Sequence, residues 1–507
     1  MMKRMILVTA AVVMMAGVAF GQYNPYSGRS SALGDPHLGG YQNVNLIDDV
    51  SDVVTFPSDV AVHSDMVQGY AGNNSALTSV NGYAYGSKKI MDMFSVGLIF
   101  NSTTYSNFAI GTYPSFSYTA LVSAVPSGLT SASANQILWA GAFSVPAAAV
   151  DFAPGSVAHF VAAIPLGSLN IGLDLFREAS NSSWTTKDVV NTPVVTPITS
   201  DHRNSEGFSN FGAKGFGIGA GLNVGNAISL KLSTGYTLLS YSAENKQTGT
   251  RTIVATGVTT TYNTETSNID ATTGYYMPIH LKVGLEMGIH KFCVGVAFEK
   301  SAQQFEAKFN DGDDAIAALT PVKSDLYSLT NMAVGIADRI QIFENTIMVP
   351  SVSMYRIACT NKPENADNAN PEVTTTDYGF PVTSLGFERD IKNVWKFDDI
   401  LVRAGGSKDV TWQAIDSKGT DATSEASGPQ NGGKFNWMLG LGLVMNNLCL
   451  DMTINPATLN GIYFISGNDG TATNGGTGPR GANVTLTYRF GGESSNIPGM
   501  APSPAMQ

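Results

Sequence analysis

The sequence predicts an all-β protein, a closed antiparallel transmembrane β-barrel of about 14 strands, with 16 as the alternative, and long extracellular loops. First, apolar and polar residues alternate through many segments, as in strands with one apolar face. Second, no run of about 20 apolar residues follows the N-terminal leader, which excludes a helical membrane domain. Third, 53 glycines and only 14% charged residues suit strands with small inward residues. A soluble β protein also alternates, but apolar faces of about 9–11 residues and aromatic residues toward strand ends favour the membrane barrel.

The clearest hairpin lies in residues 216–241. Its apolar residues occupy even positions on both sides of a bend, so the loop must hold an odd number of residues, Gly225-Asn226-Ala227. In two other hairpins the apolar residues change from odd to even positions across the bend, so each loop must hold an even number of residues. We place these loops at His290-Lys291 and Asn446-Asn447. Asparagine favours the positive φ that two-residue hairpins require. Enumerating all such segments gives sixteen strands.

The same alternation assigns the side chains to two faces. We expect the apolar positions to face lipid: Leu230, Leu232, Val283, Leu285, Leu441 and Leu450. The ionisable residues between such positions should face the lumen: Lys231, His280, Lys282, Glu286, Glu299, Asp451 and Arg489. These residues either define a polar pathway or pair with one another and brace the lumen.

The chain divides into four parts. Residues 1–21 read as a Sec signal peptide, with Lys3 and Arg4 before an apolar core. Residues 22–62 form an N-terminal plug or periplasmic lead-in, 63–490 the barrel, and 491–507 a disordered periplasmic tail. Tight connections are predicted near 166, 225–227, 290, 339 and 446, and long ones over 103–154, 179–208, 243–273, 304–324, 408–432 and 459–480. Short periplasmic turns and long outer loops are typical of outer-membrane barrels.

The last predicted strand, residues 481–490, ends in an aromatic pair, Tyr488 and Phe490. An amphipathic strand that ends in this way resembles the C-terminal signal for outer-membrane assembly. We therefore expect the lipid bilayer and the assembly machinery as partners, in the outer membrane of a Gram-negative-type bacterium. The 491–507 tail departs from the usual terminal aromatic residue.

Several other classes of function find no support in the sequence. The net charge is −11 with no basic stripe, which argues against nucleic-acid binding. Cys293, Cys359 and Cys449 are an odd count without Cys-x-x-Cys spacing, so neither a disulfide framework nor a zinc site is predicted. The acidic turn at 310–314 lacks the distal glutamate of a calcium loop. Because no nucleophile elbow, phosphate loop or carboxylate pair is visible, we expect no enzyme activity and no cofactor.

Residues 30–62 resemble a segment found in known families of outer-membrane proteins. The stretches Ser31-Ala32-Leu33-Gly34, Gly39-Gly40 and Asp48-Asp49-Val50-Ser51 resemble the N-terminal segment shared by outer-membrane long-chain fatty-acid transporters and the related type IX secretion shuttle barrels. Phe56-Pro57-Ser58 stands where those families have an Asn-Pro-Ala turn, and it departs from that turn. In the fatty-acid transporters, which have fourteen strands, this segment is a small plug inside the barrel. The resemblance thus implies a plug or gate that includes Leu33, Gly34, Gly39, Gly40, Asp48, Asp49 and Pro57. The alternative is a periplasmic lead-in that only caps the barrel.

The resemblance implies a monomeric outer-membrane channel or transporter for a hydrophobic or amphipathic small molecule. Two alternatives stay open: a non-transporting scaffold that displays loops or docks secretion partners, and a general diffusion porin. If residues 30–57 enter the lumen, we expect Asp48 and Asp49 to meet Lys231, Lys282 or Arg489.

Overall fold

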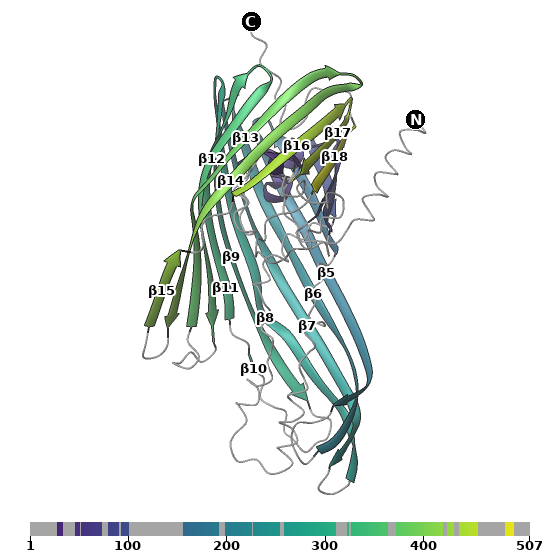
Figure 1. Ribbon diagram of the computed structural model, residues 1–507. Coiled ribbons are helices and arrows are strands. Elements are labelled where there is room, and N and C mark those ends of the chain that lie inside the picture. Colours follow the sequence, from purple (N-terminus) through teal and green to yellow (C-terminus); the bar gives the residue numbers. More distant parts are fainter. Residues whose placement is uncertain are drawn as a thin grey trace, which may run out of the picture.

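The chain folds into a closed antiparallel β-barrel (Figure 1). The computed structural model describes residues 28–33, 46–50, 52–73, 80–90, 93–100, 156–191, 198–225, 227–253, 258–310, 322–323, 326–363, 372–418, 423–429, 435–454 and 482–490. The predicted signal peptide, the predicted 103–154 connection and the predicted tail therefore lie outside the described residues. No helix within these ranges is long and apolar enough to cross a membrane.

Eighteen strands are described. They are β1 (Met66–Asn73), β2 (Val80–Ile90), β3 (Phe94–Phe100), β4 (Ser156–Leu166), β5 (Leu169–Asn191), β6 (Ile198–Val224), β7 (Ile228–Ile253), β8 (Val258–Met287), β9 (His290–Asn310), β10 (Val322–Lys323), β11 (Leu326–Phe343), β12 (Thr346–Lys362), β13 (Glu372–Val394), β14 (Phe397–Lys418), β15 (Thr423–Pro429), β16 (Phe435–Met445), β17 (Leu448–Ile454) and β18 (Ala482–Arg489). Strands that are neighbours in sequence pair along the sheet, and β1 pairs with β18 to close the ring.

Sixteen of the described strands form the ring itself. Strand β9 pairs directly with β11, and β14 pairs directly with β16. The short strands β10 and β15 extend the edges of β9 and β14 beyond those contacts. The ring therefore has the sixteen strands that enumeration of alternating segments predicts, rather than the fourteen that the N-terminal resemblance implies.

The predicted hairpins are largely found, with two corrections. Val224 lies opposite Ile228 across the three-residue loop, and Asn446 takes the positive φ of its two-residue turn. The turn predicted at His290-Lys291 is instead Gly288-Ile289, because glycine takes the positive φ of 61° there. The turn predicted near 339 was also wrong: β11 continues to Phe343. The charged residues at 338 and 339 interrupt the apolar pattern, but they remain paired with β9.

The barrel is apolar outside, and its inner side carries buried polar residues beside apolar clusters. Leu230, Leu232 and Leu441 have exposed fractions of 38%, 48% and 36%. On the same outward face, Val283, Leu285 and Leu450 are half-buried. Between these positions lie buried polar residues such as Lys282 and Asp451. An apolar exterior around a polar interior is the arrangement of a barrel surrounded by lipid.

Strands β5 to β8 extend far beyond the rest of the ring, away from the short turns (Figure 1). They contain 23, 27, 26 and 30 residues, whereas about 9–11 suffice to cross a bilayer. Much of the sequence predicted as loops at 179–208 and 243–273 is therefore paired strand. These parts are rich in serine and threonine and lack apolar alternation, because strands outside the membrane need no lipid-facing side.

Candidate functional site

The first described residues, from 28 on, lie inside the barrel near its short-turn end (Figure 1). We call residues 28–33, 46–50 and 52–63 the inner segment. It contains the helices α2 (Gly28–Ala32) and α3 (Asp52–Thr55) and the 3-10 helix η1 (Pro57–Ala61), and none of its described residues joins a strand. Its buried apolar residues are Ala32, Leu33, Leu46, Ile47, Val50, Val53, Phe56 and Val60.

These apolar residues contact two different parts of the wall. Leu33, Leu46 and Ile47 pack with inward residues of β9, β11, β12 and β13. Val50, Val53 and Val60 pack with inward residues of β1 to β4. The inner segment therefore spans the lumen instead of lining one side of it.

Glycines of the wall let the inner segment approach the strands closely. A Cβ atom at Gly172 would lie 2.2 Å from the carbonyl carbon of Pro57, and one at Gly386 would lie 2.3 Å from the carbonyl oxygen of Leu33. A side chain at either position would displace the inner segment. Sequence reasoning expected glycines of the segment itself, Gly34, Gly39 and Gly40, to allow this approach, but they lie outside the described residues. The sequence feature that could have predicted this close approach is the run of glycines at inward positions of β6.

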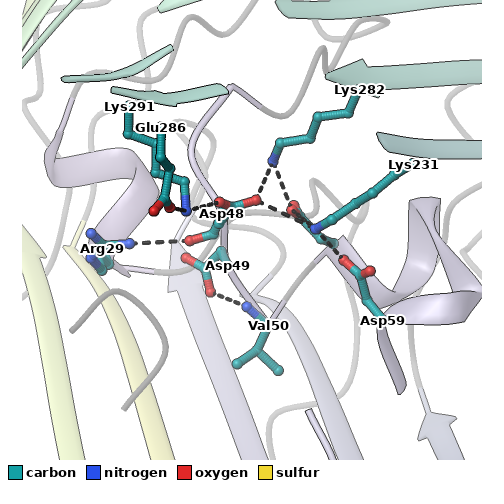
Figure 2. A network of polar contacts seen from close by, with 10 residues as sticks. Arg29, Asp48, Asp49, Val50, Asp59, Lys231, Lys282, Glu286 and Lys291 are labelled. Carbon is teal, nitrogen blue, oxygen red and sulfur yellow. Dashed lines mark hydrogen bonds and ion pairs between the residues drawn. The ribbon is translucent and has the colours of Figure 1, made fainter. Parts of the chain in front are cut away.

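Lysines of the wall hold the carboxylates of the inner segment (Figure 2). Lys282 Nζ lies 2.9 Å from Asp48 Oδ1 and 3.0 Å from Asp52 Oδ2. Lys231 Nζ lies 2.8 Å from Asp59 Oδ2 and 3.4 Å from Asp48 Oδ1. Lys231 and Lys282 stand directly opposite each other on β7 and β8, where like charges repel unless they are compensated. The aspartates supply that compensation.

A third lysine extends the network toward the short turns. Lys291 Nζ lies 3.4 Å from Asp48 Oδ2 and 3.0 Å from Glu286 Oε1 (Figure 2). These side chains are partly exposed, so this end of the network is wetter than the Asp52–Lys282 pair. We call Lys231, Lys282 and Lys291 the lysine cluster.

The carboxylates of the inner segment differ in their tendency to bind a proton. Burial raises the pKa of Asp52 to about 7, by more than Lys282 and Lys231 lower it. Burial opposes the ionisation of Asp48 only in part, since 45% of its side chain is exposed, and the lysine cluster holds its pKa well below the usual range. Asp52 therefore changes its charge near neutral pH.

A second charged network ties the inner segment to another part of the wall. Arg29 Nε lies 3.1 Å from Glu388 Oε2 on β13, and Arg403 Nε on β14 lies 2.6 Å from the same oxygen. Arg403 also pairs with Asp451 on β17. Arg29 Nη1 donates to the carbonyl oxygen of Asp48 at 3.1 Å, which joins the two networks.

Several of these residues were missed by sequence reasoning. Asp52 and Asp59 lie in an irregular segment, where no periodicity indicates which way a side chain points. Glu388 and Arg403 follow the alternation of their strands, so parity analysis of β13 and β14 would have placed them inside. Arg29 lies before the stretch that carries the resemblance.

The other predicted lumen residues are placed as follows. His280 Nε2 lies 3.6 Å from Glu299 Oε1, and the ring of Phe56 meets the His280 ring edge-on at 6.3 Å. Asp49 Oδ1 accepts a hydrogen bond from the Val50 backbone. Arg489 forms no ion pair within the described part of the chain. Asp48 therefore meets two of the three basic side chains offered by the prediction, Lys231 and Lys282.

The inner segment continues directly into the wall. Residues 62–65 lead into β1, and the carbonyl oxygen of His63 accepts hydrogen bonds from Tyr85 Oη at 2.8 Å and Ser87 Oγ at 2.6 Å. The ring closes nearby: the Phe490 backbone N donates to the carbonyl oxygen of Asp65, and the Phe490 ring meets Tyr488 edge-on at 5.4 Å. The predicted assembly signal thus lies beside the point where the inner segment enters the barrel.

Comparison with known proteins finds no matching family model and no matching curated protein. Similar solved structures include the toluene transporter TodX of Pseudomonas putida, which is 9% identical, with 93% of this chain and 99% of that chain covered and a TM-score of 0.30. The Ralstonia pickettii toluene transporter TbuX is 9% identical, with 92% and 98% covered and a TM-score of 0.30. The monoaromatic hydrocarbon channel CymD is 8% identical, with 92% and 97% covered and a TM-score of 0.32.

Proposed function

We propose that the chain is a monomeric outer-membrane channel for a small hydrophobic or amphipathic molecule, and that the inner segment is its gate. The observation that carries the proposal is that the inner segment crosses the lumen while its described residues join none of the strands. Its polar contacts are ion pairs and side-chain hydrogen bonds, which water can replace once the segment moves. The barrel lies in an outer membrane because its apolar exterior needs lipid.

The wall beside the inner segment supports an apolar cargo. Inward positions of β9, β11 and β12 carry a continuous apolar cluster: Ala297, Leu329, Ala333, Ala337, Val349 and Ile357. Leu33, Leu46 and Ile47 cover this cluster. Displacement of the inner segment would expose an apolar strip inside the barrel, whereas a general diffusion porin has a polar, water-filled interior.

A removable cross-link tests whether the inner segment must move. A Cβ atom at Gly221 of β6 would lie 3.7 Å from Ser58 Cβ, within the separation of about 3.5–4.5 Å found in disulfides. We therefore propose the double variant Ser58→Cys, Gly221→Cys in the full chain. After oxidation, uptake of a fluorescent hydrocarbon into vesicles should stop, and reduction should restore it.

The single variants Ser58→Cys and Gly221→Cys, treated with the same oxidant, control for the three native cysteines. Uptake that is unaffected by a complete cross-link would reject the gate. A barrel that carries no hydrocarbon in any state but captures a defined protein partner would favour the scaffold. Free passage of small hydrophilic solutes through the cross-linked barrel would favour the porin.

A further inference from the structure

A buried carboxylate that no described lysine or arginine neutralises lies just beyond the inner segment. Glu299 of β9 is 5% exposed and points into the barrel. Its Oε1 accepts a hydrogen bond from Tyr276 Oη at 3.1 Å, and its Oε2 accepts one from Asn331 Nδ2 at 2.9 Å. Among the described residues, the one basic side chain within ion-pair distance is His280, at 3.6 Å.

Strand pairing brings these groups together from three strands. Glu299 stands opposite Asn331 on β11 and opposite Pro278 on β8. Ser301 follows two residues after Glu299 on the same inward face and stands opposite Tyr276. The Ser301 hydroxyl is fully buried and has no hydrogen-bond partner in the described part of the chain. A carboxylate and a hydroxyl that both lack a full set of partners therefore occupy one patch of the wall.

This patch differs from the lysine cluster in its chemistry. A buried charge is normally paired with an opposite charge, as Asp52 is with Lys282. At Glu299 the two neighbouring donors are neutral, and they stabilise the ionised carboxylate without cancelling its charge. Each carboxylate oxygen has lone pairs to spare after one hydrogen bond. The patch is thus suited to a group that carries positive charge and several donors.

The patch is also next to the proposed gate. His280, which neighbours Glu299, meets the ring of Phe56 from the inner segment. Along β9, Glu299 lies farther from the short turn at 288–289 than Ala297 and Gly295, which stand opposite His280 and Lys282. The placement fits a recognition site on the route of a cargo.

We infer that Glu299, together with Ser301, Tyr276 and Asn331, binds the protonated amine of an amphipathic cargo; this inference rests on the proposed function. The ammonium group donates one hydrogen to a Glu299 oxygen and a second to the Ser301 hydroxyl, and its charge neutralises the carboxylate. The apolar part of the molecule lies along the wall. An amphiphile with a carboxylate head, such as a fatty acid, is repelled at the same place.

Three probes with the same alkyl chain and different heads test the inference: a long-chain primary amine, the matching alcohol and the matching carboxylic acid. Binding is measured by calorimetry on the full chain in lipid nanodiscs, with empty nanodiscs subtracted. We expect the amine to bind at least about tenfold more tightly than the alcohol, as for a charged hydrogen bond, and the acid to bind most weakly. Glu299→Gln should remove the preference for the amine, and Ser301→Ala should reduce it. Glu344→Gln, in the exposed turn between β11 and β12, should leave it unchanged.

Equal binding of amine and alcohol by the native chain would overturn the inference, and so would an undiminished amine preference in Glu299→Gln. If Glu299→Gln does not assemble, the native comparison of the three heads decides alone. The cysteine cross-link separates this inference from the proposed function. Equal binding of all three heads with cross-link-sensitive uptake would reject the amine site and keep the gate. A clear amine preference with uptake unaffected by the cross-link would keep the site and reject the gate.

Discussion

Removal of the Lys282 charge should release the inner segment without dismantling the barrel. Lys282 bridges Asp48 and Asp52, and both Lys282 and Asp52 are almost fully buried. Removing one partner of a buried ion pair costs about 3–5 kcal/mol. Because the pKa of Asp52 is already raised to about 7 by burial, Asp52 can take up a proton and offset part of that loss. For Lys282→Met we therefore expect a cost of about 3 kcal/mol, or roughly a 100-fold shift toward the undocked inner segment.

Single-channel recording in planar lipid bilayers measures this shift as the fraction of time that the barrel is open. The strand ladder does not depend on the Lys282 side chain, so heat-resistant migration on gels should match that of the native barrel. Lys291→Met is the matched control, because Lys291 and Asp48 are 33% and 45% exposed. An exposed pair is worth about 0–1 kcal/mol, so the open fraction should change by no more than about fivefold.

Equal open fractions for the native barrel and an assembled Lys282→Met barrel would refute this reasoning. A repair variant tests the cause. Lys282→Met combined with Asp52→Asn leaves less uncompensated charge, so it should be closed more often than Lys282→Met alone. If it is not, Lys282 acts through packing and not through its charge.

Three further predictions concern the wall, its assembly and pH. Leu232→Arg should lower the free energy of unfolding in urea, measured from bilayers, by about 2–4 kcal/mol if residue 232 lies near the midplane. The control Asn223→Arg, at an exposed strand end, should lower it by only about 0–1 kcal/mol. Equal costs for the two variants would contradict the assignment of Leu232 to the lipid face. Ser233, which alternation alone would offer as the tolerant control, is 5% exposed and unsuitable. Deletion of 492–507 should leave outer-membrane yield intact and Phe490→Ala should lower it; a normal yield for Phe490→Ala would count against the assembly signal. Burial raises the pKa of Asp52 in the docked segment to about 7, above its ordinary value of 3.8. The docked state therefore binds a proton that the released state does not, and docking weakens as pH rises through about 7. Asp48 stays ionised beside the lysine cluster, which holds its pKa low. The open fraction should therefore be larger at about pH 8 than at about pH 6, and Asp52→Asn should abolish the difference; an unchanged difference would assign it to another group.

The sequence predicts the barrel well where one face of a strand must meet lipid. There, the period of two determines both the register and the direction of each side chain, as at Leu232 and Lys282. For the same reason, alternation alone is enough to place the lysines of β7 and β8 in the lumen. The rule fails for the outer parts of β5 to β8, because both of their faces lie beyond the membrane and no apolar pattern is required.

The contacts of the inner segment could be predicted only in part. The resemblance of residues 30–62 indicated a plug, and Asp48 was expected to meet Lys231 or Lys282, as it does. The roles of Asp52 and Asp59 depend on how an irregular backbone turns inside the lumen, which propensity and periodicity do not determine. Glu388 and Arg403 stand directly opposite each other on the adjacent strands β13 and β14, so the register of that hairpin could have paired them. The contact of Arg29 with Glu388 depends on where the inner segment lies in the lumen, which no local pattern indicates.

The link between the inner segment and β1 has a kinetic consequence. Because residues 62–65 continue into the wall and the His63 carbonyl oxygen is fixed by Tyr85 and Ser87, a released inner segment stays attached at the ring closure. Its return is then a unimolecular event at a high effective concentration, of the order of millimolar for a short linker. Resealing should therefore be fast and independent of the amount of protein in the membrane. Each barrel would be closed again by its own inner segment, and closure would need no other molecule.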